Sequence, residues 1–206
     1  MALIDDLISG GWLKTPRIIG AFKKIKRIDF LPEDIKNLAE LNEALPIGCN
    51  QTISQPLTVA FMMELLEPKE GDKILDIGSG SGWTTALLAE IVKPKGKVFA
   101  IEIIPELKEF GEKNTAKYNF IKKGIAEFIY ADGSKGYDKE APYDRILCSA
   151  AAQDKVPKAW KEQLKVGGRI VTPIGSSIWL FVKKTEQEFI KLEYPGFAFV
   201  PLIESR

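Results

Sequence analysis

Histidine does not occur in the 206-residue sequence. This absence excludes every catalytic arrangement that depends on an imidazole, such as a serine or cysteine nucleophile activated by histidine, and every histidine-liganded metal. Only two cysteines occur, Cys49 and Cys148, and their spacing is not that of metal ligands. We therefore expect no metal site and no disulfide framework, and any chemistry must proceed without an imidazole base.

An excess of one charge sign, a long apolar run and a basic N-terminus are also missing. The chain carries 29 Lys and Arg residues against 28 Asp and Glu residues, which gives no overall attraction for nucleic acid or anionic lipid. We interpret the basic run at residues 23–27 as a solvated helix face. No apolar run approaches the ~18 residues of a membrane span, and Asp5 and Asp6 stand where a signal peptide would be basic and then apolar. These features predict a cytoplasmic protein without nucleic-acid or membrane partners.

The sequence contains no repeat and no linker rich in Gly, Ser or Pro, so its length fits one compact unit. We expect residues 1–55 to form a short helical N-terminal extension and residues 56–206 to form the main domain. Within the extension, Thr15 and Pro16 start a helix whose apolar stripe continues to Ile25. Residues 45–48 are expected to be a loop.

From residue 56 onward, apolar strands alternate with helices. The pattern predicts strands at 73–77, 97–102, 126–131, 144–149 and 168–173, and helices at 56–66, 84–92, 105–118 and 157–164. Nearly continuous apolar character in each strand is typical of a parallel sheet that is covered on both faces. Residues 178–183 and 188–193 are predicted to form a hairpin, and 197–203 a last strand. We therefore expect a doubly wound α/β fold with a mostly parallel, seven-stranded sheet and an antiparallel C-terminal edge.

A glycine-rich segment, D-I-G-S-G-S-G at residues 76–82, lies between the first of these strands and the next helix. In doubly wound sheets, ligands bind at the carboxyl ends of the strands, where glycines let the backbone approach a ligand closely. A dinucleotide fingerprint would need a third glycine where Trp83 stands, and a Walker loop would need a lysine that is absent. Neither motif fits. A turn that only reverses the chain is the alternative for this segment.

Two further strand ends carry acidic residues. Glu102 follows Gly82 by 20 residues, a spacing at which a carboxylate reaches the ribose hydroxyls of an adenosine ligand. Asp132 and Gly133 end the next strand, where simple turn initiation is the alternative. The whole pattern resembles the first motif of class I methyltransferases, whose loop passes beneath the methionine part of S-adenosylmethionine. That cofactor carries two cationic groups and no phosphate, so an acidic site suits it.

The segment L-P-I-G-C-N-Q-T-I-S-Q-P at residues 45–56 makes the resemblance more specific. Together with the glycine loop and with Asp132-Gly133-Ser134-Lys135-Gly136 and Phe199-Val200-Pro201-Leu202, it is similar to the protein-L-isoaspartate O-methyltransferase family over about residues 31–203. The resemblance implies a monomeric Rossmann-like enzyme that methylates the α-carboxylate of L-isoaspartyl residues in damaged proteins and releases S-adenosylhomocysteine. It implies cofactor contacts from Thr52, Asp76, Gly78, Ser79, Gly80, Ser81, Gly82, Glu102, Ile103, Asp132 and Gly133. It implies acceptor contacts from Ile53, Ser54 and Val200, with Ser54 at the position of the family's active-site serine.

The implied chemistry suits a chain without histidine. A carboxylate acceptor with a reference pKa near 4 is already ionised at neutral pH and needs no general base. Attack on a sulfonium methyl group needs alignment, which contributes up to ~7–11 kcal/mol in well-oriented systems. Ser54 precedes Pro56 at a predicted helix start, where backbone N–H groups and the helix dipole favour an anion. The alternative is that Ser54 only caps this helix.

The chain departs from the family pattern at several positions. Cys49-Asn50 replaces a segment that often contains histidine, and we interpret Cys49 as a partly buried residue rather than a nucleophile. Gln153 follows an alanine run where proline is common, and Ile178-Trp179 lies where many members have glutamine. These changes leave open a methyltransferase with another carboxylate, peptide or small-molecule acceptor. A binding domain that kept the fold without catalysis is the third reading.

Overall fold

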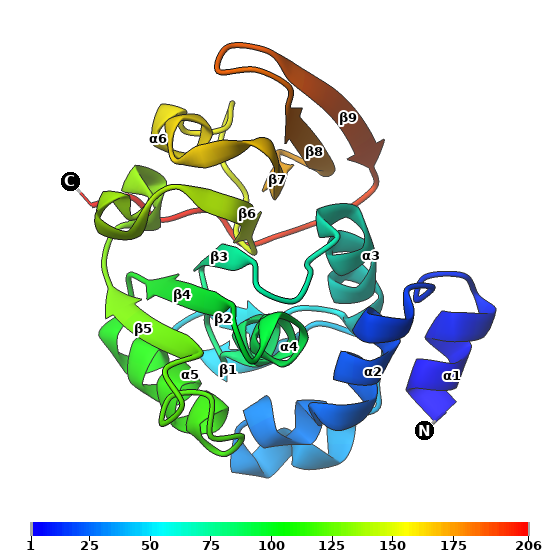
Figure 1. Ribbon diagram of the computed structural model, residues 1–206. Helices are drawn as coiled ribbons and strands as arrows, with labels where there is room; N and C mark the ends of the chain where they lie inside the picture. The colour runs from blue at the N-terminus through cyan, green and yellow to red at the C-terminus, as the bar shows by residue number, and fades with distance from the viewer. Residues whose placement is uncertain (1, 206) are drawn as a thin grey trace.

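The computed structural model describes residues 2–205, which form a twisted seven-stranded sheet with helices on both sides (Figure 1). The strand order is β5-β4-β3-β6-β7-β8-β9, and the first five of these strands are parallel. The last two strands, β8 and β9, are antiparallel to their neighbours, which confirms the predicted edge. The strands are β3 Lys73–Ile77, β4 Lys97–Glu102, β5 Ala126–Tyr130, β6 Tyr143–Cys148, β7 Leu164–Ile174, β8 Ser177–Lys183 and β9 Phe189–Pro195.

The chain order of the strands reverses between β3 and β6. From β3 the chain proceeds to β4 and β5 on one side, and then returns to β6 on the other side of β3. Crossovers on either side of such a switch point diverge, so a crevice opens at the carboxyl ends of the two central strands. Ile77 at the end of β3 is in register with Ile101 and Cys148, so the candidate loops after these strands start from one edge.

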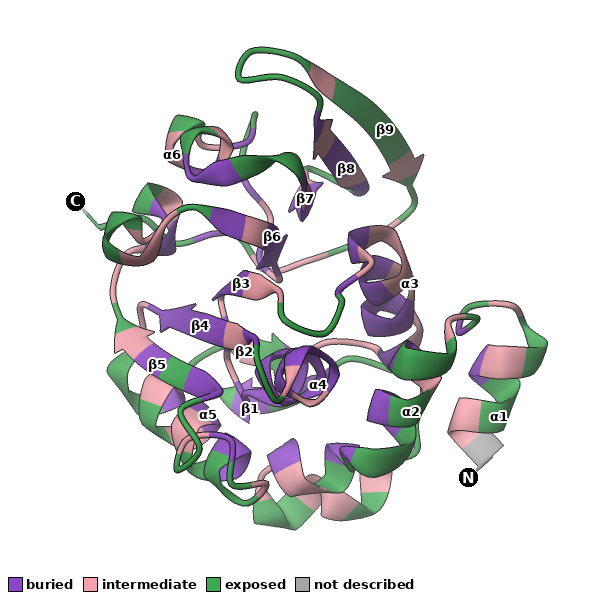
Figure 2. Ribbon diagram, in the orientation of Figure 1, coloured by how far each residue is buried: buried purple, intermediate pink, exposed green. Residues whose placement is uncertain are grey.

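Helices cover the two faces of the sheet through two separate hydrophobic clusters. One face packs against α3 Pro56–Leu66, α4 Trp83–Val92 and α5 Pro105–Ala116. The opposite face packs against α6 Lys158–Glu162, whose Trp160 is fully buried, and against the C-terminal segment through Leu202. Strands between two covered faces have apolar side chains on both, and Figure 2 shows the central strands almost entirely buried.

The N-terminal residues pack onto the helices of the main domain. They form α1 Ala2–Ser9, α2 Pro16–Lys24 and two short 3₁₀ helices, η1 Arg27–Phe30 and η2 Glu33–Leu38. Phe22 of α2 meets Trp83 of α4 edge to face, with ring centroids 5.6 Å apart. Because the extension shares its apolar cluster with α3 and α4, it buries surface that neither part would bury alone. The division at residue 55 stays a prediction.

Two expectations about the chain path are wrong. Residues 45–48 are not a loop: they form β1 Leu45–Gly48, which pairs with β2 Gln51–Ile53 across a turn in which Cys49 and Asn50 have φ of 50° and 56°. Two successive left-handed residues are typical of a tight hairpin turn, although neither residue here is glycine. Residues 197–203 do not form a strand beside the sheet. They cross the ends of the strands instead, and within the described chain their only bridge joins Pro201 to Ala151.

Within residues 2–205, no helix is long and apolar enough to cross a bilayer.

Candidate active site

The glycine loop is shaped by close backbone packing behind it. Gly78, Gly80 and Gly82 all have positive φ, a region that L side chains rarely adopt. A Cβ on Gly82 would lie 2.5 Å from the carbonyl oxygen of Gly111 in α5, which leaves room only for glycine. The N–H groups of Gly78 and Ser79 both donate to the carbonyl of Ile101, at 2.9 and 3.1 Å. The loop is therefore fixed by α5 and β4 as well as by its own sequence.

Asp76 lies behind the glycine loop and is completely buried. Its Oδ2 accepts hydrogen bonds from the hydroxyls of Thr84 at 3.0 Å and Thr85 at 2.6 Å, both in α4. Burial raises the pKa of Asp76 to about 6, although these two hydroxyls act in the opposite direction. The carboxyl group thus ties β3 to α4 beneath the loop.

Glu102 braces the loop from the end of β4. Its Oε2 accepts from the Gly80 N–H at 2.9 Å, and its Oε1 accepts from the N–H groups of Ile103 and Ile104 at 2.9 and 3.0 Å. A carboxylate has about four acceptor positions, so these three bonds leave one for a donor in the cavity. Glu102 is the only charged residue among the described residues that line this cavity, which makes the cavity suitable for a cationic ligand and unsuitable for phosphate.

Asp132 is saturated by hydrogen bonds. Its Oδ1 accepts from the N–H and hydroxyl of Ser134, and its Oδ2 accepts from the N–H and hydroxyl of Ser205 near the end of the chain. Burial alone would raise the pKa of Asp132, but these bonds lower it far below its usual value. Asp132 therefore holds the C-terminal segment against the loop that contains Gly133.

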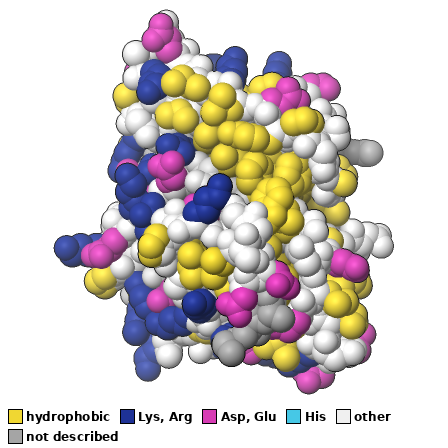
Figure 3. Space-filling model, turned by 90° about the vertical axis from the view of Figure 1, so that its right-hand side faces the viewer, with side chains coloured by type: hydrophobic (Ala, Val, Ile, Leu, Met, Phe, Trp, Pro, Cys, Tyr) yellow, Lys and Arg dark blue, Asp and Glu magenta, His cyan; other side chains and the backbone are white. Residues whose placement is uncertain are grey.

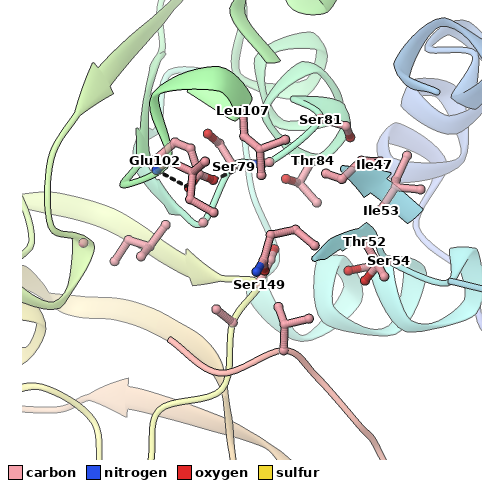
Figure 4. A pocket seen from close by; sticks show the side chains of 18 of the residues that line it. Ile47, Thr52, Ile53, Ser54, Ser79, Ser81, Thr84, Glu102, Leu107 and Ser149 are labelled. Atoms are coloured by element: carbon pink, nitrogen blue, oxygen red, sulfur yellow. Dashed lines mark hydrogen bonds between the residues drawn. The ribbon is translucent and has the colours of Figure 1, made fainter. Parts of the chain in front are cut away.

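A narrow cavity of about 70 Å³ lies between the hairpin β1–β2, the glycine loop, the ends of β3, β4 and β6, and the C-terminal segment. In Figure 4, Ser79, Glu102 and Leu107 lie on one side of it, and Ile47, Ile53 and Ser54 lie on the other. Most of the predicted cofactor contacts line the cavity: Thr52, Gly78, Ser79, Gly80, Ser81, Glu102, Ile103 and Gly133. The three predicted acceptor contacts, Ile53, Ser54 and Val200, line it as well.

Three predicted cofactor contacts lie outside this lining: Asp76, Gly82 and Asp132. Their direct contact with a cofactor stays a prediction, since each is engaged by the protein behind or beside the loop. Conversely, several lining residues were not among the predicted contacts, including Ile47, Trp83, Leu107, Ser149 and residues 201–203. Only the fold brings these side chains together.

Ser54 follows β2 and precedes α3. The N-cap residue of α3 is Gln55, and the N–H of Leu57 is capped by Oδ1 of Asn42 at 3.0 Å. The Gln55 amide donates to the Asn42 carbonyl at 2.9 Å, which fixes this cap in place. Among residues 2–205 no hydrogen bond to the Ser54 hydroxyl is present. The interpretation of Ser54 as a helix cap is therefore wrong, and its hydroxyl is available at the cavity.

Arg27 contradicts the interpretation of residues 23–27 as a solvated face. The three lysines of this run are exposed, but Arg27 is buried. Its guanidinium donates to four carbonyls, those of Ala39, Leu41, Glu43 and Ser54, at 2.7–3.3 Å. Burial lowers the pKa of Arg27 to about 10, so the group stays charged at neutral pH. Arg27 thus joins η1, the loop before β1 and the backbone of Ser54.

Comparison with known protein families identifies the kind of protein to which this site belongs. The family model described as protein-L-isoaspartate(D-aspartate) O-methyltransferase matches residues 1–206, the whole chain. The chain belongs to this family. A protein-L-isoaspartate O-methyltransferase of Methanopyrus kandleri is 44% identical over 205 residues, covering 98% of this chain and 89% of the relative. A protein-L-isoaspartate O-methyltransferase 2 of Archaeoglobus fulgidus is 47% identical over 189 residues, covering 90% and 84%.

Solved structures of the family have the same fold. A protein-L-isoaspartate O-methyltransferase of Plasmodium falciparum, in complex with S-adenosyl-L-homocysteine, superposes with a TM-score of 0.87 over 99% of this chain and 98% of that chain. At 21% identity, this likeness shows the fold alone. A second protein-L-isoaspartate O-methyltransferase has 27% identity and a TM-score of 0.87, covering 97% of this chain and 64% of that chain. The predicted Rossmann-like methyltransferase fold is confirmed.

The departures from the family pattern do not alter the described cavity wall. Cys49 and Asn50 form the turn of the hairpin, and Cys49 is exposed rather than partly buried as expected. Gln153 is exposed after β6, and Ile178 is buried within β8. Trp179 of β8 stacks on Phe181, with ring centroids 6.0 Å apart. None of these five residues belongs to the described lining of the cavity.

Proposed function

We propose that this chain transfers a methyl group from S-adenosylmethionine to the α-carboxylate of L-isoaspartyl residues in damaged proteins. The observation that carries the proposal is the membership of the whole chain in the family, together with one cavity that joins the glycine loop to Ser54. Repair follows because the methyl ester, unlike the free carboxylate, carries a methoxy leaving group. The backbone nitrogen of the next residue can attack the ester carbonyl carbon, which closes a succinimide and releases methanol, and hydrolysis of the succinimide can restore a normal aspartyl linkage.

The residues present fit the methyl donor. Glu102 keeps one acceptor position for a ribose hydroxyl, and the Ser79 hydroxyl and Trp83 indole N–H are buried polar groups with no partner among residues 2–205. Such groups favour a bound polar ligand, because an unpaired buried donor costs about 1–3 kcal/mol. We propose that residues 78–81, Thr52, Glu102, Ile103 and Gly133 hold the donor, which supplies an electrophilic methyl carbon when bound.

The protein's part in the reaction is to hold an ionised acceptor in line and to exclude water. We propose that the Ser54 hydroxyl donates to the acceptor carboxylate, with Ile53 and Val200 beside it. The start of α3 adds positive potential at this point, because the helix dipole has its positive end there. No step requires an imidazole, which agrees with a chain that lacks histidine.

The setting of the enzyme is proposed on similar grounds. Both cysteines are free thiols, which suits a reducing cytoplasm. Charges of opposite sign are nearly equal in number, which gives no basis for nucleic acid as a partner. We also propose that the enzyme is a monomer. Isoaspartyl peptides and proteins are then the partners.

The test is methyl transfer from labelled S-adenosylmethionine to an isoaspartyl peptide and to its aspartyl twin. We expect turnover on the isoaspartyl peptide alone. Cofactor binding without transfer to either peptide would contradict the proposed acceptor and favour another one. Calorimetry with S-adenosylhomocysteine separates this case from a domain that has lost cofactor binding, since such a domain would release no heat.

A further inference from the structure

A second, wider depression adjoins the narrow cavity. This groove has a volume of about 730 Å³, and it shares Thr52, Ser54, Ser149 and Val200 with the cavity. The shared residues include Ser54, at which the acceptor carboxylate is proposed to bind. The peptide that carries this carboxylate must therefore leave the cavity through or along the groove.

One wall of the groove is aromatic and comes from distant parts of the chain. Phe61 of α3 lies at the centre of an aromatic cluster that includes Trp12, Tyr194 and Phe197. The Phe61 ring meets Trp12 edge-on at 5.8 Å and Tyr194 edge-on at 5.1 Å, and it stacks on Phe197 at 5.5 Å. Trp12, Leu57, Phe197 and Phe199 line the groove itself. Figure 3 shows hydrophobic side chains gathered in a band across this side of the molecule.

The polar part of the groove lining is uncharged. It contains Thr52, Ser54, Gln55, Thr58 and Ser149, and no Asp, Glu, Lys or Arg occurs among the described residues that line the groove. Hydroxyl and amide groups can pair with the backbone of an extended peptide, whereas an ionised side chain would lose hydration against this lining without gaining an ion pair. An apolar ring would gain burial against the aromatic wall.

We propose that the groove is a subsite for the residue adjacent to the isoaspartyl residue, and that it selects an aromatic or large apolar side chain over a charged one. The inference rests on the proposed function, because it takes Ser54 as the point from which the peptide extends. Trp12 is the specificity residue: it is 36% exposed and stands at the free edge of the aromatic cluster. Acceptors of this class are segments whose aromatic neighbours are exposed, as in unfolded chains.

The first experiment uses the unmodified protein. In a series of isoaspartyl peptides, each residue flanking the isoaspartyl position is changed in turn to Phe, Ala, Asp or Lys, and kcat/KM is measured with saturating cofactor. We expect a Phe neighbour on one side to raise kcat/KM by about tenfold over Ala, the effect of burying part of an aromatic ring. Asp and Lys neighbours on that side are expected to fall below Ala. Equal values across the series would overturn the subsite.

The second experiment uses Trp12→Ala, with Tyr130→Ala as the matched control. Tyr130 is also an exposed aromatic residue, at 63%, but it lies on β5 outside the groove. The ratio of kcat/KM for the Phe peptide to that for the Ala peptide is expected to fall toward one in Trp12→Ala and to stay at the wild-type value in Tyr130→Ala. An unchanged ratio in Trp12→Ala would exclude Trp12 as the specificity residue. Because this ratio does not depend on the concentration of active enzyme, it can still be interpreted if part of the variant protein is unfolded.

The failure of this inference is distinguishable from the failure of the proposed function. If no isoaspartyl peptide of the series is methylated while S-adenosylhomocysteine binds, the acceptor assignment is wrong and the groove is not a subsite for it. If all peptides are methylated with equal kcat/KM, the acceptor assignment holds and only the flanking preference is wrong.

Discussion

The cofactor side and the acceptor side of the cavity are built in different ways. On the cofactor side, the glycine loop, Glu102 and Gly133 lie at the ends of adjacent parallel strands, so the sheet register alone brings them together. On the acceptor side, Ser54 is held by Arg27 and lies beside a helix capped by Asn42. The groove next to it needs Trp12 from one end of the chain and Phe197 from the other.

This difference in construction separates cofactor binding, which many enzymes of this fold share, from the selection of a particular acceptor. A site at strand ends persists as long as the sheet persists, and it can serve many acceptors. A groove assembled from loops and terminal segments can change residue by residue without disturbing the sheet. Substitutions on the two sides should therefore have different signatures: cofactor affinity on one, acceptor selection and local stability on the other.

Gly111→Ala should have the largest effect, and it falls on the cofactor side. A Cβ at this position would lie 2.6 Å from the Gly80 carbonyl oxygen and 2.9 Å from the Phe128 ring. The backbone of the glycine loop cannot move aside as the end of a flexible side chain can. We therefore expect a loss of about 3 kcal/mol in stability and at least a tenfold weaker cofactor affinity. Denaturant unfolding and calorimetry with S-adenosylhomocysteine measure the two effects.

Gly20→Ala is the matched control for this substitution. Gly20 also lies within a helix, but a Cβ there would have no heavy atom within 4 Å. Helix propensity then predicts a gain of about 0.5–1 kcal/mol with unchanged cofactor affinity. Equal behaviour of the two variants would mean that the contact between α5 and the glycine loop does not shape the site.

Arg27→Met tests the acceptor side. Four carbonyls would lose their donor, including that of Ser54, and we expect stability to fall by about 3 kcal/mol. In protein that remains folded, kcat should fall more than cofactor affinity, because the displaced group is Ser54 and not the glycine loop. Arg27→Lys keeps the positive charge but cannot reproduce the planar set of guanidinium N–H donors. We therefore expect its stability and kcat to lie between those of wild type and Arg27→Met. Full activity in Arg27→Met would contradict this role.

Asp76→Asn tests the buried carboxyl group through pH. Since the folded state raises its pKa from 3.8 to about 6, the native protein keeps a proton that the unfolded chain releases between about pH 4 and pH 6. Asp76 therefore removes up to roughly 3 kcal/mol of stability as the pH rises through this window. Asparagine has no such dependence, so the stability of the variant relative to wild type should rise from pH 4 to pH 6. If the difference in unfolding free energy between the variant and wild type did not change with pH, burial would be excluded as the cause of the raised pKa.

Ser54→Ala should have the smallest effect on stability. Its hydroxyl has no partner among residues 2–205, and the cap of α3 comes from Asn42, so the unfolding free energy should change by less than about 0.5 kcal/mol. Loss of one hydrogen bond to a carboxylate corresponds to a fall of about 10- to 100-fold in kcat/KM for an isoaspartyl peptide. A large loss of stability with normal turnover would instead identify Ser54 as structural.

The parts of the fold that the sequence predicted correctly have local signals. Each parallel strand is an apolar run, and the glycine loop is one uninterrupted segment, so β3 through β7 and the turn after β3 could be placed. The hairpin β1–β2 could not, because Pro46 and Gly48 are typical loop residues and its turn contains Cys49 and Asn50. The final segment was expected to be a strand from its apolar residues, but it packs across strand ends.

The candidate site was predictable to the same extent. Residues at strand ends could be placed in one cavity, and Ser54 could be placed beside them through its motif. Arg27 looked like one of several surface charges, since the sequence does not show that four carbonyls surround it. Asn42 and Ser149 gave no signal because their contacts, such as those of Asn42 with Gln55 and Leu57, form only in the folded chain. Asp132 was expected to face a ligand, yet Ser205 occupies half of its acceptor positions.

The aromatic cluster has a consequence for how the enzyme loses function. Phe61 lies in α3, and its neighbours Trp12 and Phe197 belong to the N-terminal and C-terminal segments. Fraying of the N-terminal segment would remove Trp12 from the groove while the sheet and the narrow cavity, which Trp12 does not line, remain intact. Terminal segments open at lower free energy than core strands. Discrimination among peptides would then disappear on warming before methyl transfer itself does, and acceptor selectivity becomes an early indicator of local unfolding.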